Sequence, residues 1–182
     1  MPCPKLSLTL SAVAVLALRL SAADVAFEAT QAANAKETVL KASDITPKIF
    51  PETVFYRGRV ATVQMRNTGG VHFADDMYLL AGLVDVSGYS SSVREKYQGY
   101  LVTEVAVDID GKPLKPGAYG IGFVQGSRFI VTDLGSNNLL EAAGKKDAEL
   151  KGPVPLQVVA APDAGSYRLY VGRDYVTLKR AR

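Results

Sequence analysis

The chain is poor in cysteine. Of its 182 residues only Cys3 is a cysteine, and it lies in a leader that we expect to be removed. The mature protein would then have no disulfide, no thiol nucleophile and no cysteine-containing metal site. An exported chain without disulfides is more typical of bacteria than of the eukaryotic secretory route, where small domains often depend on such bridges.

Histidine, tryptophan and the familiar catalytic motifs are scarce or missing. His72 is the only histidine, and there is no tryptophan. The sequence contains no nucleophile elbow, no phosphate-binding loop and no dinucleotide fingerprint. We therefore predict no cofactor, and the motifs assign no catalytic residue.

An excess of one charge is missing as well. The 21 lysines and arginines nearly balance the 18 acidic residues, which leaves a formal charge of +3. Two of the positive charges, Lys5 and Arg19, lie in the expected leader, so the mature chain would carry only +1. This charge gives no long-range attraction for nucleic acid or an acidic membrane, and we expect no nucleic-acid partner.

The first 23 residues have the organisation of a cleavable signal peptide. Lys5 gives a positive start, and the stretch from Leu6 to Leu18 is apolar and uncharged. Ser21 and Ala23 place small residues at the positions that a cut after Ala23 requires. The apolar run is too short for a typical membrane anchor, although a retained anchor is the alternative. We predict a periplasmic or secreted bacterial protein with no membrane span after cleavage.

Composition changes again near residue 50. Residues 24–41 are rich in alanine and have few large apolar side chains, which indicates a surface helix or a flexible segment. Pro47 and Pro51 then favour extended backbone. From Val54 onwards apolar residues recur with a period of two. We therefore predict a flexible or helical lead-in over residues 24–50 and a single β domain over residues 51–182.

The β domain contains about eight expected strands joined mainly by short loops. The nearly continuous apolar run from Met77 to Val86 is typical of a central strand, and Tyr100 to Ile109 alternates as one further strand. Three segments near the end predict a meander: Leu156–Ala160, Tyr167–Val171 and Tyr175–Leu178. An antiparallel β-sandwich accounts best for this order, and a partly open β-barrel is the alternative.

Turns and short helices interrupt these strands. Asn67-Thr68-Gly69-Gly70 and Asp110-Gly111 predict tight turns. Ser92 stands three residues before Glu95, a capping-box spacing that predicts a short helix ending by Gly99. A second short helix, capped by the segment Asn138–Glu141 and interrupted at Gly144, is also predicted.

Two stretches resemble parts of small exported bacterial β-sandwich modules. Val107 to Tyr119 reads V-D-I-D-G-K-P-L-K-P-G-A-Y. It is similar to a hairpin of those modules in which I-x-G-K ends one strand and L-x-x-G-x-Y opens the next. Ser166-Tyr167-Arg168-Leu169, followed by a short return strand, is similar too. The resemblance implies a sandwich fold and, because these modules have no established activity, it implies no chemistry.

One candidate site centres on the single histidine. Asp75 and Asp76 follow His72 closely, and a histidine with carboxylates can bind a metal such as zinc or act as a general base. The alternative is a histidine at a strand end followed by a solvated turn. Glu104 lies between apolar residues, so it would mark a site if it faced inward. If it faces outward, it is an ordinary solvated glutamate.

A second candidate site is a ligand groove. Gly120 and Gly122 lie on one face of their strand, where missing side chains let a ligand approach. Tyr89, Tyr97 and Tyr100 would edge this groove, with Glu104 as its carboxylate, and would suit a sugar or a peptide. The alternative is close packing of these glycines against the short helix predicted just before Gly99.

These observations favour a non-enzymatic binding or envelope-accessory module whose partner is a protein or a small ligand such as a sugar or a peptide. The alternative is a hydrolase or a metal-dependent enzyme that uses His72 with nearby carboxylates.

Overall fold

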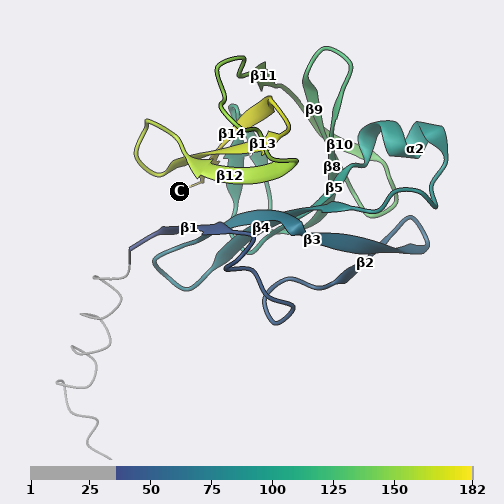
Figure 1. Cartoon of the computed structure of the whole chain (residues 1–182), viewed down its shortest axis with the longest axis horizontal. Helices are drawn as coiled ribbons and strands as arrows, with labels where there is room; N and C mark the ends of the chain where they lie inside the picture. The colour runs from purple at the N-terminus through teal and green to yellow at the C-terminus, as the bar shows by residue number, and fades with distance from the viewer. Residues whose placement is uncertain (1–35, 182) are drawn as a thin grey trace, which may run out of the picture.

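Two antiparallel sheets packed face to face form the protein (Figure 1). The computed structural model describes residues 36–181. It confirms the predicted β-sandwich, in preference to a partly open barrel. The predicted signal peptide, residues 1–23, and the first part of the predicted lead-in, residues 24–35, lie outside the described residues.

Within residues 36–181, the larger sheet has eight strands. Its order is β1 (Thr38–Lys41), β3 (Arg59–His72), β4 (Tyr78–Val84), β5 (Gly99–Thr103), β8 (Gly117–Val124), β9 (Arg128–Thr132) and β10 (Asn138–Ala143). The remaining strand, β2 (Thr53–Tyr56), pairs with the start of β3, whereas β1 pairs with its last four residues. The predicted central strand is confirmed as β4, which lies between β3 and β5.

In the described part of the chain, the smaller sheet has six strands. Its order is β12 (Leu156–Ala160), β13 (Ser166–Val171), β14 (Asp174–Arg180), β6 (Val107–Ile109) and β7 (Lys112–Leu114), with β11 (Lys145–Lys146) also paired to β14. The predicted C-terminal meander is confirmed as β12, β13 and β14. The predicted Asp110-Gly111 turn joins β6 to β7, and both residues have the positive φ that such a turn requires.

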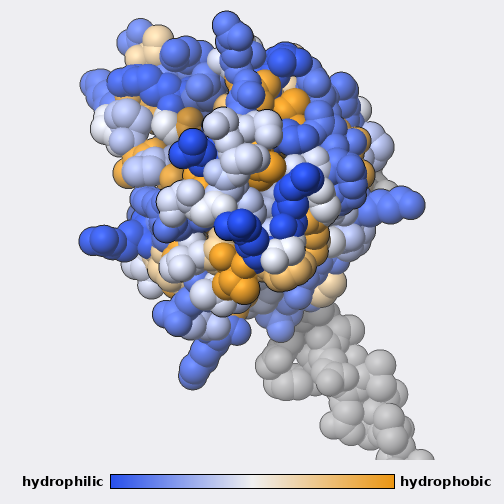
Figure 2. Space-filling model, turned by 90° about the vertical axis from the view of Figure 1, so that its right-hand side faces the viewer, coloured by the Kyte–Doolittle hydropathy of each residue, from blue (hydrophilic) through white to orange (hydrophobic). Residues whose placement is uncertain are grey.

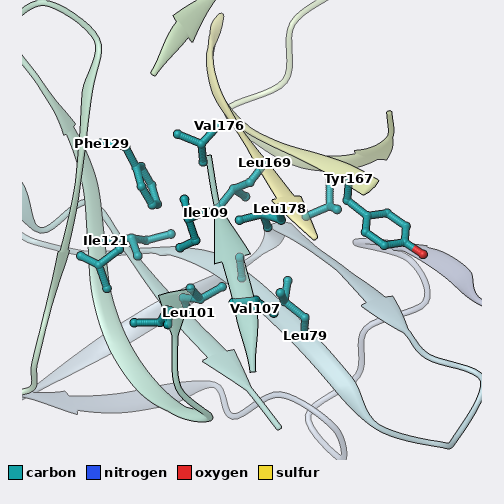
Figure 3. Packing of buried hydrophobic residues seen from close by; sticks show 14 of the residues in the cluster. Leu79, Leu101, Val107, Ile109, Ile121, Phe129, Tyr167, Leu169, Val176 and Leu178 are labelled. Atoms are coloured by element: carbon teal, nitrogen blue, oxygen red, sulfur yellow. The ribbon is translucent and has the colours of Figure 1, made fainter. Parts of the chain in front are cut away.

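The main core lies between the two sheets. Figure 3 shows Leu79, Leu101 and Ile121 of the larger sheet facing side chains of the smaller one. The facing residues include Val107, Ile109, Leu169, Val176 and Leu178. Because side chains alternate between the faces of a strand, every second apolar residue points into this layer. The alternation of apolar residues in the sequence therefore determines which face of each sheet is buried in the main core.

A second core covers the outer face of the larger sheet. It contains side chains from β2, from the loop before β2 and from the helix α2 (Ser91–Lys96) with the residues that flank it, packed on outward-facing residues of β3, β4 and β5. Tyr56 and Tyr97 stack with their ring centroids 3.6 Å apart. This core explains why β4 reads as a continuous apolar run, since Leu79 faces one core and Leu80 faces the other.

The segment Tyr100–Ile109 is two strands rather than one. It breaks at Glu104–Ala106 and passes from β5 in the larger sheet to β6 in the smaller one. The Thr103 hydroxyl donates to the carbonyl of Val105 over 2.6 Å and stabilises the corner. Thr103, Val105, Val107 and Ile109 all remain buried across the break. The period of two therefore predicted correctly which side chains of this segment share a buried face. It does not indicate that the segment changes from one sheet to the other.

Two predicted helical features differ from the structure. Residues 138–143 form β10, with Leu140 and Ala142 buried at a strand period, so the predicted helix there is wrong. The earlier helix is present as α2, but its N-cap residue is Ser90, and Ser90 makes no side-chain capping bond. The predicted capping box is therefore also wrong.

Part of the predicted lead-in belongs to the fold. β1 lies in the larger sheet, and Ile45 and Phe50 are buried in the second core. The ordered chain therefore includes residues well before residue 51. Within residues 36–181, no helix is long and apolar enough to cross a membrane.

Candidate functional site

The structure brings His72 and Asp76 together. His72 lies at the end of β3, and its Nε2 is 2.7 Å from Asp76 Oδ1. Its ring stacks on Tyr78 with the centroids 4.4 Å apart. The pair is at the surface, because the Asp76 side chain is 88% exposed. This arrangement matches the structural alternative given for His72 in the sequence analysis, a histidine at a strand end followed by a solvated turn.

Asp75 does not join this pair. It forms two hydrogen bonds with the Arg180 guanidinium, at 2.8 and 2.7 Å. The bond from Arg180 is the main reason why the pKa of Asp75 lies below its usual value. In the part of the chain that the structure describes, no three metal-ligating side chains lie close enough together to hold an ion.

Glu104 lies at the corner after β5 and faces outward. Its carboxylate accepts a hydrogen bond from the backbone N–H of Tyr78 over 2.8 Å, and its own N–H donates to the Tyr78 carbonyl. The residue is exposed and does not lie mid-strand as predicted. Its contacts hold the start of β4 against the end of β5, which is a structural role.

The space predicted for a ligand above Gly120 and Gly122 is filled by the protein itself. A Cβ on Gly120 would lie 2.5 Å from Tyr56, and a Cβ on Gly122 would lie 2.7 Å from the Lys96 carbonyl at the end of α2. Tyr89, Tyr97 and Tyr100 are all buried in the second core. Gly122 therefore allows close packing against α2, as the alternative interpretation stated, whereas Gly120 allows close packing against Tyr56 of β2.

The end of the molecule that carries α2 and the β2–β3 hairpin does not provide a broad apolar surface. Figure 2 shows this face with small hydrophobic patches scattered among hydrophilic residues. Phe55 and Val60 are exposed there as a cross-strand pair on the hairpin. Two such residues are too few for a stable interface on their own.

A groove that the sequence did not predict lies between β1 and β12. Its volume is about 440 Å³. We call it the edge groove and define it by its lining residues, which come from β1 and the residue after it, from β3, and from β12 with the preceding loop. They are Val39, Leu40, Lys41, Ala42, Arg66, Thr68, Val154, Leu156, Gln157, Val158, Val159 and Ala160. Eight of these twelve side chains are apolar, so the groove suits an apolar occupant.

A glycine in β3 lets the two sheets approach each other below this groove. A Cβ on Gly69 would lie 2.8 Å from the backbone nitrogen of Val158 in β12, closer than real Cβ contacts occur. Gly69 and its neighbour Gly70 lie within β3, so the predicted turn at Asn67–Gly70 is wrong. The pair Gly69-Gly70 could have indicated this contact from the sequence, because a glycine inside a strand often marks a place where another backbone approaches closely.

Both strands that border the edge groove have a free edge. Among residues 36–181, β12 pairs only with β13, and β1 pairs only with β3. Pro155 and Ala161 form backbone bonds toward the β13 side. By alternation, Gln157 and Val159 do so as well, whereas the backbone groups of Leu156, Val158 and Ala160 point away from β13.

The free edge of β1 is partly closed. The Lys41 N–H donates to the Asp44 carboxylate over 2.9 Å, and the Asp44 N–H donates to the Lys41 carbonyl over 2.9 Å. By alternation, the backbone groups of Val39 point the same way, into the edge groove. Before β1, Tyr167 of β13 donates a hydrogen bond to the Glu37 carboxylate. Burial and this contact raise the pKa of Tyr167.

Sequence reasoning missed the edge groove because its two walls are far apart in the chain. One wall was assigned to the lead-in, and the other was recognised only as part of the C-terminal meander. Comparison with family models, curated proteins and solved structures gives no match for this chain.

Proposed function

We propose that this protein is an exported, non-enzymatic binding module that holds an extended apolar segment of a partner protein in the edge groove. The observation that carries the proposal is the placement of this groove between two strands that, within the described part of the chain, each pair on one side only. An added peptide strand obtains hydrogen bonds from such an edge and specificity from the side chains beside it.

The dimensions fit a short extended peptide. The five residues of β12 offer an edge of about 16 Å, since a strand rises about 3.3 Å per residue. Alternate side chains of a bound strand would face the apolar wall made by Val39, Leu156 and Val154. Val154 is 43% exposed, so an occupant would cover apolar surface that is now in water.

The competing enzymatic function has less support. Asp75 is engaged by Arg180 and Glu104 by the backbone of Tyr78, so neither carboxylate is directed at His72. His72 contacts Asp76 at the surface. Glu104 lines a hollow with Tyr78, Leu80 and Val102, and His72 is not among the residues that line it.

Selection from a library of short random peptides displayed on phage tests the proposal. We expect the purified protein to enrich peptides rich in Val, Ile, Thr and Leu, and we expect Val154→Asp to abolish their binding. Val60→Asp is the matched control, because it places the same charge at another exposed valine, outside the groove. Equal loss of binding in both variants, or no peptide whose binding depends on Val154, would contradict the proposal.

A further inference from the structure

We infer that the segment bound in the edge groove carries an aspartate or glutamate side chain, held by Lys41 and Arg66. This inference rests on the proposed function and names the chemistry of the partner. Lys41 and Arg66 are the two charged residues that line the groove, and no acidic residue lines it. An apolar segment with one carboxylate would complement this lining in both polarity and charge.

Neither cation has a carboxylate partner among residues 36–181. No ion pair within 4 Å involves Lys41 Nζ or the Arg66 guanidinium there. Asp44 lies close in sequence, but its two oxygens accept bonds from the Lys41 backbone N–H and from the Ser43 hydroxyl. By contrast, Arg128 and Arg180 on other parts of the surface are each paired with an acid.

A β-bulge directs Arg66 to the groove. The pairing of β3 with β4 is regular from Thr68 onwards, but between Val63 and Thr68 four residues of β3 have no place in the ladder. Bulges re-aim side chains and are often found beside functional sites. Thr68 secures the end of this bulge, because its hydroxyl donates to the Met65 carbonyl over 2.8 Å.

Arg66 lines both the edge groove and a second hollow of more mixed polarity. This second hollow of about 460 Å³ is lined by residues Thr62–Asn67, including Gln64, Asn67 and Arg66 itself. The Asn67 amide donates to the Gln64 side-chain oxygen over 2.7 Å, so two polar side chains of this hollow are held beside Arg66. The occupant would therefore place apolar residues beside β12 and its carboxylate beside Arg66.

The inference commits to a peptide rather than a fatty acid, although both combine an apolar chain with a carboxylate. The reason is the backbone of β12 and β1 along the groove. The Val158 nitrogen is packed against Gly69 of β3, but the outward-facing N–H and C=O groups of Leu156 and Ala160 can pair with a peptide and gain nothing from a hydrocarbon chain.

The same peptide selection, repeated with charge variants, tests the inference. On the unmodified protein we expect an acidic residue at a recurrent position among the enriched peptides. On Arg66→Glu we expect a lysine or arginine there instead, whereas Arg66→Lys should retain the preference for an acid. A synthetic peptide in which this glutamate is replaced by glutamine should bind about three- to fivefold more weakly, because the cations are exposed. The difference should disappear at high salt.

The outcomes separate the inference from the proposed function. Enriched peptides that depend on Val154 but show no acidic preference, or that keep it in Arg66→Glu, overturn the inference and leave the proposed function intact. Absence of any Val154-dependent peptide overturns both. Fluorescently labelled dodecanoate that binds in a Val154-dependent manner and displaces the selected peptides also overturns the inference, since the occupant would then be a lipid.

Discussion

At the scale of single residues, the tyrosine hydroxyls of the second core differ in whether they have a hydrogen-bond partner. Tyr56 shares a hydrogen bond of 2.7 Å with Thr132. The Tyr97 hydroxyl is buried and, among the residues described, has no hydrogen-bond partner. A buried polar group without a partner costs about 1–3 kcal/mol. We therefore expect Tyr97→Phe to raise the free energy of unfolding by about 1 kcal/mol and Tyr56→Phe to lower it by about the same amount. Urea unfolding measures both.

The Tyr97 variant should also change the response to alkaline pH. Burial, and to a smaller degree the neighbouring tyrosines, raise the pKa of Tyr97 above its usual value of 10.0. Because the unfolded chain then loses this proton first, stability is fully present below pH 10 and falls as the pH rises further. Tyr97→Phe removes this contribution, so its unfolding free energy should fall less steeply above pH 10. If Tyr97→Phe were destabilised as Tyr56→Phe is, and its unfolding free energy fell as steeply above pH 10 as that of the unmodified protein, the packing of Tyr97 described here would be wrong.

Single residues also show how far the candidate sites could be predicted. The proximity of His72 and Asp76 was foreseeable from their spacing around a turn. The engagement of Asp75 by Arg180 was not, because these residues are more than a hundred positions apart and meet only after both sheets form. For Glu104 the burial of its neighbours was predicted correctly, but the sheet corner that exposes it was not.

At the scale of elements, the close approach of β12 to β3 depends on Gly69. An alanine there would place its Cβ 2.8 Å from the Val158 nitrogen, which is backbone and cannot turn aside. Such overpacking costs about 1–3 kcal/mol, so we expect Gly69→Ala to lower the unfolding free energy by that amount and to weaken peptide binding in the edge groove. Denaturant titration and peptide affinity measure the two effects.

Gly88→Ala is the control for this prediction. The nearest atom to a Cβ on Gly88 is the Arg59 Nη1, 3.7 Å away, which is ordinary contact. This variant should leave binding unchanged and alter stability by less than about 1 kcal/mol. If Gly69→Ala behaved in the same way, β12 would not be held against β3 as the structure shows.

Elements whose partners are local were predicted best. The meander β12–β13–β14 and the turn at Asp110-Gly111 follow from short loops and alternating residues alone. The strand β10 was predicted as a helix because Asn138 resembles a cap, whereas its pairing with β9 decides its conformation. The edge groove could not be predicted, since it requires β1 and β12 to meet across the sandwich.

At the scale of the whole molecule, the proposed function requires export. The predicted cut after Ala23 gives a mature protein that begins at Asp24 and carries a formal charge of +1. On expression in a bacterium with its native leader, we expect the periplasmic or secreted fraction to hold a protein whose N-terminal sequence is Asp24-Val25-Ala26.

Ala23→Leu is the variant that tests the export signal, because a large residue at the position before the cut blocks cleavage of such a leader. We expect it to retain the leader and to accumulate with the membrane fraction. Val13→Leu is the control, since it keeps the apolar run of the leader and should be processed normally. A full-length, unprocessed chain in the soluble cell interior would contradict export. The edge groove would then face cytoplasmic partners, and the exported binding module proposed here would be wrong in its location.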